Sequence, residues 1–218
     1  MTTTQPRRVA LFGASGNIGH HVLDQLLAAG HDVTAYVRNP AKLDRANPTL
    51  TIVTGELHDA AAIAKAVEGA DAVISALGPT LKRSATGTPV TEGTRHIVAA
   101  MQAAGVRRYI GLATPAMADQ RDRPTLKGKV LRLMPRLAMP NALAEIDGMA
   151  AAVTDSGLDW TIARITNPTD KPAKGTTRAG FLGRDGVGMA MTRADIATFL
   201  VNQLTDDTYR RAAPAISN

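Results

Sequence analysis

The sequence of 218 residues contains no cysteine, and aromatic side chains account for only 3% of it. Without cysteine the chain forms neither disulfides nor thiolate metal sites, so the sequence is compatible with a reducing compartment. The few aromatics leave the core to alanine, valine, leucine and isoleucine. They also provide few of the stacking platforms that single-stranded nucleic-acid binding needs, so we do not expect nucleic acid as a partner.

Long hydrophobic runs are missing as well. The first apolar run, Val9 to Phe12, is too short for a membrane span or for the core of a signal peptide. Hydrophobic residues make up 44% of the chain and charged residues 20%, which is typical of globular domains. We expect a cytoplasmic protein that does not enter a membrane, with its oligomeric state left open and a monomer allowed. The expected organisation is a single domain over residues 1–218, with a flexible tail at 1–6 and substrate-side insertions at 115–140 and 166–192.

Negative charge is in the minority, because 25 lysines and arginines face 19 aspartates and glutamates, for a net charge of +6. Much of the excess lies between Arg121 and Arg136, where basic residues accompany a single acid, Asp122. A stretch of this kind is able to contact a phosphorylated ligand or a partner surface. A solvated basic lobe is the more ordinary interpretation, and it is the one we favour.

Short apolar runs alternate with amphipathic segments along the chain, which is the pattern of βαβ units. Right-handed crossovers turn this alternation into a Rossmann-like α/β fold, a doubly wound parallel sheet with a small C-terminal substrate lobe. Two helix starts carry their own signals: Thr88-Pro89 combines a capping residue with a first-turn proline, and Thr192 with Asp195 forms a capping box. The predicted strands cover residues 8–13, 32–37, 50–53, 72–76, 108–113 and 159–164, and the predicted helices cover 18–30, 60–68, 88–105, 141–156 and 192–204.

A glycine-rich turn, Gly13-Ala14-Ser15-Gly16-Asn17-Ile18-Gly19, joins the first predicted strand to the first helix. Glycine allows a tight turn, lets backbone N–H groups approach a pyrophosphate and lets the helix pack closely on the strand, while the helix N-terminus favours negative charge. The spacing G-x-x-G-x-x-G is weak evidence as an isolated string. Its position, directly after an apolar strand and before an amphipathic helix, predicts dinucleotide binding.

The end of the second predicted strand distinguishes NAD from NADP. An NAD site places an acid there for the ribose hydroxyls, whereas the 2′-phosphate of NADP requires a cation. The strand ends in Val37-Arg38-Asn39, and its acid, Asp32, lies at the opposite end. We therefore predict that Arg38 holds the 2′-phosphate of NADP(H), with Lys42 as a second cation. The alternative is a solvent-facing loop arginine.

Several motifs along nearly the whole chain are shared with one known family. Besides the glycine turn, they are Val37–Pro40, Asp71–Gly78, Glu92–Met101, Asp155–Thr161 and Leu204–Tyr209. In these motifs the chain resembles the atypical short-chain dehydrogenase/reductase proteins of the NAD(P)H-binding, NmrA-like group, and in particular their flavin reductase (biliverdin reductase B) branch. The motifs concern the cofactor more than the substrate.

This resemblance implies a set of cofactor contacts at the carboxyl ends of the predicted strands, where open α/β sheets bind ligands. It implies that Thr114, after the fifth strand, lies beside the nicotinamide, and that Thr166 and Asn167 lie on the other side of that ring. The other implied contacts surround the pyrophosphate (Gly13, Ser15, Gly16, Asn17, Ile18 and Gly19), border the adenine (Glu56 and Leu57) and line the middle of the cofactor (Ala76, Leu77 and Gly78).

Two features depart from the family pattern. The Tyr-x-x-x-Lys pair of ordinary short-chain dehydrogenases is missing, because Tyr36, Tyr109 and Tyr209 are not followed four residues later by lysine. Thr114 is too weak an acid to replace that tyrosine near neutral pH, so we expect it to orient the nicotinamide or a substrate carbonyl, or else to bond to local backbone. Asn167 stands where the resembled branch has a pocket histidine, which argues against tetrapyrrole reduction.

Three further titratable side chains have ordinary interpretations. His20 and His21 lie in the opening turns of the first helix and are expected to be surface or packing residues. No carboxylate or other histidine accompanies them at metal-ligand spacing, so we expect no metal site. Glu145 lies on the helix that faces the predicted cleft, where we favour a solvated helix carboxylate over a part of the substrate pocket.

The leading hypothesis is an NADPH-dependent oxidoreductase that transfers hydride to a flavin-like or other conjugated small-molecule acceptor, whose proton comes from water. The main alternative is a non-catalytic NADPH-binding redox sensor, in which cofactor occupancy changes a surface that a partner recognises. A third interpretation, an isomerase or dehydratase with tightly held NAD, conflicts with Arg38 and with the missing acid–base pair. The sequence does not identify the acceptor.

Overall fold

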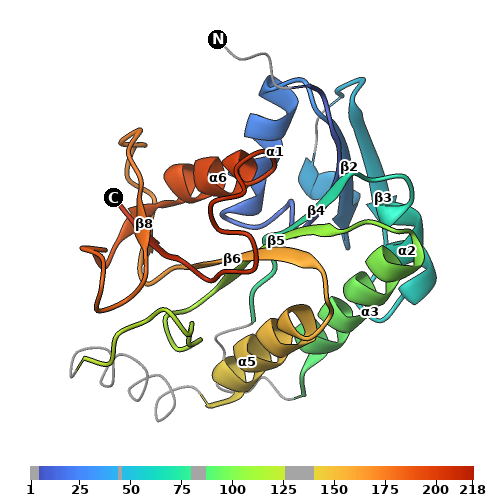
Figure 1. The fold of residues 1–218 in the computed structure, drawn as a ribbon. Helices are drawn as coiled ribbons and strands as arrows, with labels where there is room; N and C mark the ends of the chain where they lie inside the picture. Colours follow the sequence, from blue (N-terminus) through green and yellow to red (C-terminus); the bar gives the residue numbers. More distant parts are fainter. Residues whose placement is uncertain (1–4, 44–45, 80–86, 126–139) are drawn as a thin grey trace.

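The centre of the protein is a sheet of eight strands in the order β3-β2-β1-β4-β5-β6-β10-β8, accompanied by a two-stranded sheet of β7 and β9 (Figure 1). The computed structural model describes residues 5–43, 46–79, 87–125 and 140–218. The strands are β1 (Arg8–Phe12), β2 (Asp32–Val37), β3 (Leu50–Thr54), β4 (Ala72–Ser75), β5 (Arg108–Ala113), β6 (Asp159–Arg164), β7 (Pro168–Thr169), β8 (Arg178–Gly180), β9 (Met191–Thr192) and β10 (Ala215–Ser217).

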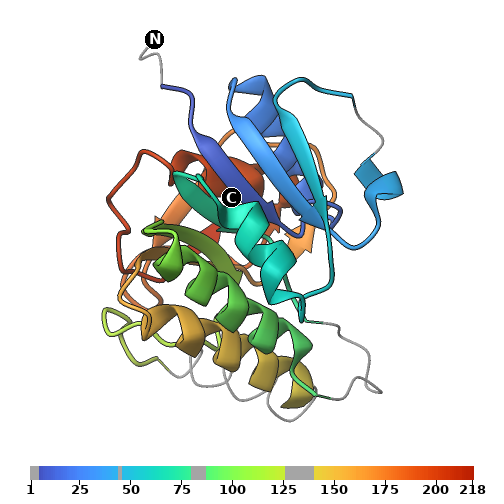
Figure 2. The same ribbon diagram turned by 90° about the vertical axis from the view of Figure 1, so that its right-hand side faces the viewer.

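Helices cover both faces of the larger sheet. They are α1 (Gly19–Ala28), α2 (Ala60–Val67), α3 (Pro89–Ala103), α5 (Pro140–Thr154) and α6 (Arg193–Asn202), with a short 3-10 helix, η1 (Pro40–Leu43). α1 and α6 pack together on one face, whereas α2, α3 and α5 lie on the other, where α3 and α5 run side by side (Figures 1 and 2). None of the described helices is long and apolar enough to cross a membrane.

Each face of the sheet has its own apolar core, built from alternate residues of the same strands. In β1, Val9 and Leu11 belong to the core beneath α1 and α6, and Ala10 and Phe12 belong to the core beneath α2, α3 and α5. Because helices cover both faces, β1 is a continuous apolar run rather than an alternating one, which is the pattern expected of a buried parallel strand.

The strand order reverses beside β1. The chain moves from β1 outward to β2 and β3, and then returns to place β4 on the other side of β1. All pairings from β3 to β6 are parallel, so the carboxyl ends of these strands meet at one edge of the sheet. In open α/β sheets the crevice outside such a reversal is the usual ligand site. The fold therefore places the glycine turn, which follows β1, at this crevice.

The predicted fold class is confirmed, and β2, β5 and β6 cover the predicted residues. The sheet is not wholly parallel, however, because β8 runs antiparallel to β10. The sequence pattern missed the four strands β7 to β10. Each of them has only two or three residues, and so short a strand contains no readable periodicity.

The start of the basic stretch is tied to the body of the protein. Its single acid, Asp122, forms an ion pair of 2.7 Å with the buried Arg164, while the guanidinium of Arg121 lies 5.0 Å from the ring centre of Phe181. Residues 126–136 of the predicted basic lobe lie outside the described residues. In its described part the stretch is therefore an anchored segment whose acid is not solvated.

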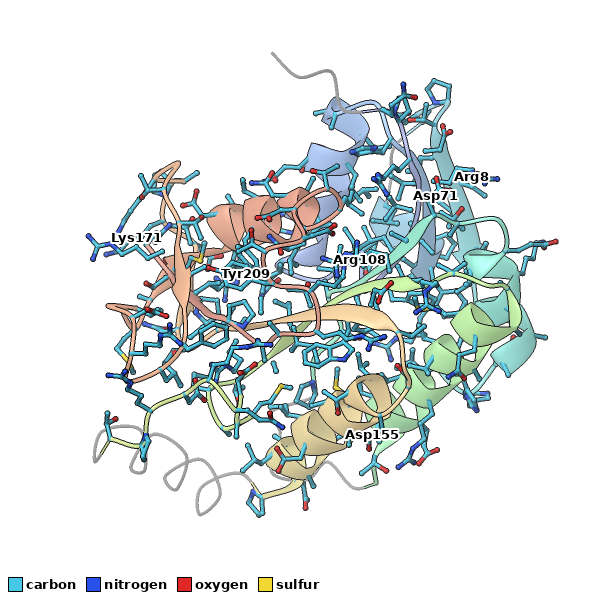
Figure 3. The ribbon with its side chains drawn as sticks, in the orientation of Figure 1. Arg8, Asp71, Arg108, Asp155, Lys171 and Tyr209 are labelled. Atoms are coloured by element: carbon cyan, nitrogen blue, oxygen red, sulfur yellow. The ribbon has the colours of Figure 1, made fainter. Side chains whose placement is uncertain are left out.

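Arg108 fixes the amino ends of β5 and β6, opposite the glycine turn. Its buried guanidinium donates hydrogen bonds to the carbonyl oxygen of Gln203 at 2.7 Å and to the hydroxyl of Thr161 at 2.9 Å. The hydroxyl of Thr161 in turn donates to the carbonyl oxygen of Tyr209 at 2.9 Å. Figure 3 labels Arg108 and Tyr209, which lie between α6 and β6 in that view. These bonds hold the two strands together at the end away from the crevice.

Candidate nucleotide-binding cleft

The glycine turn after β1 is tightly packed at its first and last residues. Gly13 has a φ of +79°, which side-chain-bearing residues rarely adopt, and a Cβ there would lie 2.9 Å from the backbone of Ala76. A Cβ on Gly19 would lie 1.9 Å from the carbonyl oxygen of Gly13. These two glycines therefore allow α1 to start directly against β1 and the end of β4.

The N-terminus of α1 opens toward solvent at this turn. Ser15, Gly16 and Asn17 are exposed, whereas Ala14 is buried beneath them. In the described structure no side chain caps α1, and its first turn contains no acidic residue. The positive end of the helix dipole is thus available to an anion such as a pyrophosphate.

A cleft of about 630 Å³ follows the carboxyl ends of β1 to β4 and continues to the N-termini of α3 and α5. This volume lies in the range of pockets that bind small molecules, roughly 300–1,000 Å³. Nine of the residues predicted to contact the cofactor line it: Gly13, Ser15, Gly16, Arg38, Glu56, Leu57, Ala76, Leu77 and Gly78.

Arg38 and Lys42 form a cationic end of the cleft, directly after β2. Both side chains are exposed, and neither has an ion-pair partner among the described residues. The Oδ1 atom of Asn39 accepts a hydrogen bond from the N–H of Ala41 at 3.0 Å, which fixes the turn that carries both cations. The arrangement is suited to a phosphate group.

Tyr36 supports the wall of the cleft beside this cationic end. Its hydroxyl donates a hydrogen bond of 2.7 Å to the carbonyl oxygen of Glu56 and so links β2 to the segment after β3. Burial, together with the charges of Asp59 and Glu56, raises the pKa of Tyr36 to about 12. Tyr36 is thus a neutral group bound to backbone rather than a proton donor for a ligand.

Six predicted contacts do not line the cleft as described. Some of them belong to the glycine turn, where Gly19 is buried as the first residue of α1 and Asn17 is exposed. The others lie at the ends of β5 and β6, beyond β4 in the sheet. The six are Asn17, Ile18, Gly19, Thr114, Thr166 and Asn167.

Thr114 lies at the end of β5, next to the segment that follows β6. The N–H of Ile165 donates to the carbonyl oxygen of Ala113 at 2.9 Å, which keeps Thr114 and Thr166 at neighbouring strand ends. The Oγ1 atom of Thr114 accepts a hydrogen bond of 3.4 Å from the N–H of Ala116. A bond of this length is weak, so the half-buried hydroxyl is not firmly held by local backbone.

Glu145 is the cleft residue whose role the sequence did not predict. It is only 5% exposed, and its carboxylate oxygens accept hydrogen bonds from the backbone N–H groups of Val90 at 2.9 Å and Thr91 at 2.7 Å, at the start of α3. The interpretation of Glu145 as a solvated carboxylate is therefore wrong. So is the prediction that Thr88 caps α3, because Thr88 makes no side-chain capping bond.

His20 and His21 pack against each other beside the glycine turn, with ring centres 4.0 Å apart. A ring nitrogen of His20 lies 3.0 Å from the carbonyl oxygen of Gly16. Burial and the neighbouring His20 lower the pKa of His21. Among the described residues no three potential metal ligands lie together, and the two histidines act as packing residues.

The fold and the cleft together define a dinucleotide-binding α/β protein of the Rossmann type. Residues 13–207 match the family described as NAD(P)H-binding, and the chain belongs to that family. This match confirms the family that the motifs predict.

Similar curated proteins are named as reductases and dehydrogenases. A (4-alkanoyl-5-oxo-2,5-dihydrofuran-3-yl)methyl phosphate reductase of Streptomyces griseus is 27% identical over 215 residues, which are 96% of this chain and 67% of that protein. A 3-beta-hydroxysteroid dehydrogenase of Mycolicibacterium neoaurum is 34% identical over 117 residues, which are 49% of this chain and 32% of that protein. The chain thus spans about a third of the length of the curated relatives that it matches first.

Solved structures share the fold over nearly the whole chain. A short-chain dehydrogenase/reductase from Veillonella parvula in complex with NADP has a TM-score of 0.75 at 19% identity, covering 97% of this chain and 94% of that one. The anaerobilin reductase ChuY of Escherichia coli O157:H7 has a TM-score of 0.76 at 20% identity, covering 96% of each chain. At these identities the likeness establishes the fold alone.

Proposed function

We propose that the protein is an NADPH-dependent reductase that transfers hydride to a conjugated small-molecule acceptor of the oxidised-flavin type. The observation that carries this proposal is the continuity of the cleft, because Arg38, the glycine turn and the N-termini of α3 and α5 all line one cavity. A dinucleotide laid along it has its adenosine phosphate near Arg38, its pyrophosphate at the turn and its nicotinamide beyond β4, toward Thr114. Membership of the NAD(P)H-binding family supports this cofactor class.

The choice of NADPH over NADH rests on the end of β2. Arg38 and Lys42 present two cations there, and a cation favours the 2′-phosphate that a carboxylate would repel. The acid at this end of the cleft, Glu56, follows β3 instead, where we propose that it borders the adenine with Leu57. The NADP complex of the Veillonella parvula neighbour is compatible with this assignment.

The acceptor is proposed to be conjugated because the described lining residues include no tyrosine whose hydroxyl is available as a proton donor. Tyr36 is the tyrosine among the described lining residues, and its hydroxyl donates a hydrogen bond to the carbonyl oxygen of Glu56. A flavin or an unsaturated carbonyl compound takes hydride into a delocalised system and takes its proton from water.

Thr114 is proposed to orient the reacting groups rather than to act as an acid. Its weakly bonded hydroxyl at the end of β5 is free to hydrogen-bond to the nicotinamide amide or to an acceptor carbonyl. We place Thr166 and Asn167 on the opposite side of the nicotinamide, since they follow the neighbouring strand β6. The remaining turn residues, Asn17 and Ile18 among them, are proposed to surround the pyrophosphate.

The proposal is tested by NADPH oxidation with riboflavin and FMN as acceptors. Thr114→Val is expected to lower kcat several-fold, which corresponds to the loss of a hydrogen bond of about 0.5–1.5 kcal/mol, without weakening NADPH binding. Thr198→Val, which removes an exposed hydroxyl on α6, is the matched control and is expected to leave both unchanged. A protein that binds NADPH but turns over no flavin, quinone or simple carbonyl compound would contradict the reductase and favour the sensor.

A further inference from the structure

The far end of the cleft contains a carboxylate bound at a helix N-terminus. Glu145, on α5, lines the cleft and accepts hydrogen bonds from two backbone N–H groups of α3, those of Val90 and Thr91. The hydroxyl of Thr91 donates a third bond to it, at 2.6 Å. With only 5% of its surface exposed, Glu145 is a buried carboxylate whose two oxygens both accept hydrogen bonds from protein donors.

This carboxylate occupies a place that would otherwise attract an anionic ligand. The N-terminus of a helix binds anions through its free N–H groups and its dipole. Val90 lines the cleft and the buried Thr91 follows it in the chain. Thr88 caps neither N–H group, so without Glu145 both groups would lack this partner at the edge of the cleft. A second anion approaching this helix end meets occupied donors and a like charge, and both effects oppose its binding.

The position of Glu145 along the cleft determines whether its charge affects binding of the cofactor or binding of the acceptor. The cations Arg38 and Lys42 follow β2, whereas α3 follows β4 in the chain and packs against α5, the helix between β5 and β6. If the phosphates of the dinucleotide lie at the β2 end and at the glycine turn, the α3 end is left for the nicotinamide and the acceptor. The cleft therefore has two different ends. Arg38, Lys42 and the glycine turn are suited to phosphate groups, whereas at α3 the anion-binding N–H groups are already bonded to Glu145.

We infer that Glu145 determines which acceptor charge the site prefers. Because of Glu145, the far end of the cleft binds neutral conjugated acceptors more tightly than acceptors that carry a phosphate or carboxylate group. This inference rests on the proposed function and adds a substrate class to it. Glu145 acts here as a specificity-determining residue in two ways. Its negative charge repels an anionic acceptor, and it occupies the N–H groups to which such an acceptor would otherwise bind. It is assigned no proton transfer.

If Glu145 were only a structural cap of α3, its replacement would have a different effect on acceptor binding. Loss of a cap lowers stability, and it weakens the binding of neutral and anionic acceptors to the same extent. A role in charge selection changes the ratio of the two affinities. The informative readout is therefore the riboflavin-to-FMN affinity ratio, since these two flavins share the ring system and differ in the phosphate.

The test measures binding of riboflavin and of FMN to protein saturated with NADP⁺, by quenching of flavin fluorescence. The unaltered protein is expected to bind riboflavin about tenfold more tightly than FMN, and Glu145→Gln is expected to remove most of that preference. Glu145→Ser, which leaves the two N–H groups open, is expected to favour FMN further. Glu92→Gln is the charge-matched control, because Glu92 also lines the cleft but pairs with the side chain of Arg95 instead of the N–H groups at the start of α3, and it is expected to shift the ratio less.

A second experiment uses inorganic phosphate as the anion and does not depend on flavin binding. Phosphate is expected to raise the Tm of NADP⁺-loaded Glu145→Ser, and not that of the unaltered protein or of Glu92→Gln. An unchanged flavin ratio in both Glu145 variants, or equal phosphate effects in all proteins when no flavin binds, would overturn the inference. Normal flavin discrimination without any NADPH oxidation would instead overturn the proposed function and leave the charge selection intact.

Discussion

Arg164 and Asp122 form a buried ion pair, in which each carboxylate oxygen of Asp122 accepts a hydrogen bond of 2.7 Å from the guanidinium. Arg164 ends β6 and is fully buried, and Asp122 accepts a further bond of 2.9 Å from the N–H of Leu182. Burial opposes the charge of Asp122, but the bonds and charge of Arg164 outweigh it and keep the pKa of Asp122 below its ordinary value. The pair holds the segment after β5 against β6 and against the residues after β8.

Asp122→Ala is expected to lower the free energy of unfolding by about 3–5 kcal/mol, because it leaves the guanidinium of Arg164 buried without its carboxylate. Chemical denaturation followed by circular dichroism measures this loss. Arg95→Ala removes only the exposed pair with Glu92 and serves as the control, with an expected cost below about 1 kcal/mol. Equal losses in the two variants would show that the Arg164 pair is not buried in solution.

Gly19→Ala is expected to damage both the fold and the cofactor site. The added Cβ would lie 1.9 Å from the carbonyl oxygen of Gly13, and backbone cannot move aside as a flexible side chain does. We expect a loss of about 1–3 kcal/mol in unfolding free energy and at least about a tenfold loss of NADPH affinity, measured by calorimetric titration. Gly186→Ala, where a Cβ meets open space, is the control and should alter neither quantity. Destabilisation with unchanged NADPH affinity would place the pyrophosphate elsewhere.

Arg38→Ala is expected to weaken NADPH binding by about 10- to 100-fold, since a charge-assisted hydrogen bond contributes about 1.5–3 kcal/mol. NADH lacks the 2′-phosphate, so its dissociation constant should change little. Arg38→Lys keeps the charge but loses the paired donors of the guanidinium, and an intermediate loss is expected. The measurement is the dissociation constant of each variant for NADPH and for NADH. If Arg38→Ala still prefers NADPH, Arg38 does not hold the 2′-phosphate.

Alkaline pH is expected to destabilise the protein between about pH 10 and pH 12. Burial raises the pKa of Tyr36 and of Tyr109 from 10.0 to about 12. A raised folded-state pKa of this kind contributes stability that is complete below the unfolded-state pKa and is lost as the pH rises through the folded-state value. Tyr36→Phe removes one such group, so this variant should lose less stability across the window, although it loses a hydrogen bond of about 1 kcal/mol at neutral pH. Denaturation curves at neutral and alkaline pH test this, and identical slopes for both proteins would refute it.

Local patterns were sufficient to predict the elements that position the cleft. A buried parallel strand is a predominantly apolar run, and β2, β5 and β6 are largely apolar after a charged first residue. Gly30, with a φ of +78°, ends α1 as its position after the last apolar residue predicts. Arg38 and the glycine turn were accessible for the same reason, because each follows directly on a recognisable strand.

The contacts of Glu145 and Asp122 left no comparable pattern in the sequence. Glu145 binds the N–H of Val90, 55 positions away, and Asp122 binds Arg164, 42 positions away. A carboxylate on an amphipathic helix or in a basic stretch has the same local surroundings whether it is solvated or buried. Only the packing of α5 against α3, and of the segment after β5 against β6, decides between these two states.

β10 is the strand that joins β6 to β8 in the sheet. Because it comes from Ala215–Ser217, the ribosome delivers it long after β6 has been synthesised. Until then β6 has an open edge, which is able to pair with strands of other nascent chains. During synthesis this edge of β6 therefore stays unpaired until β10 emerges.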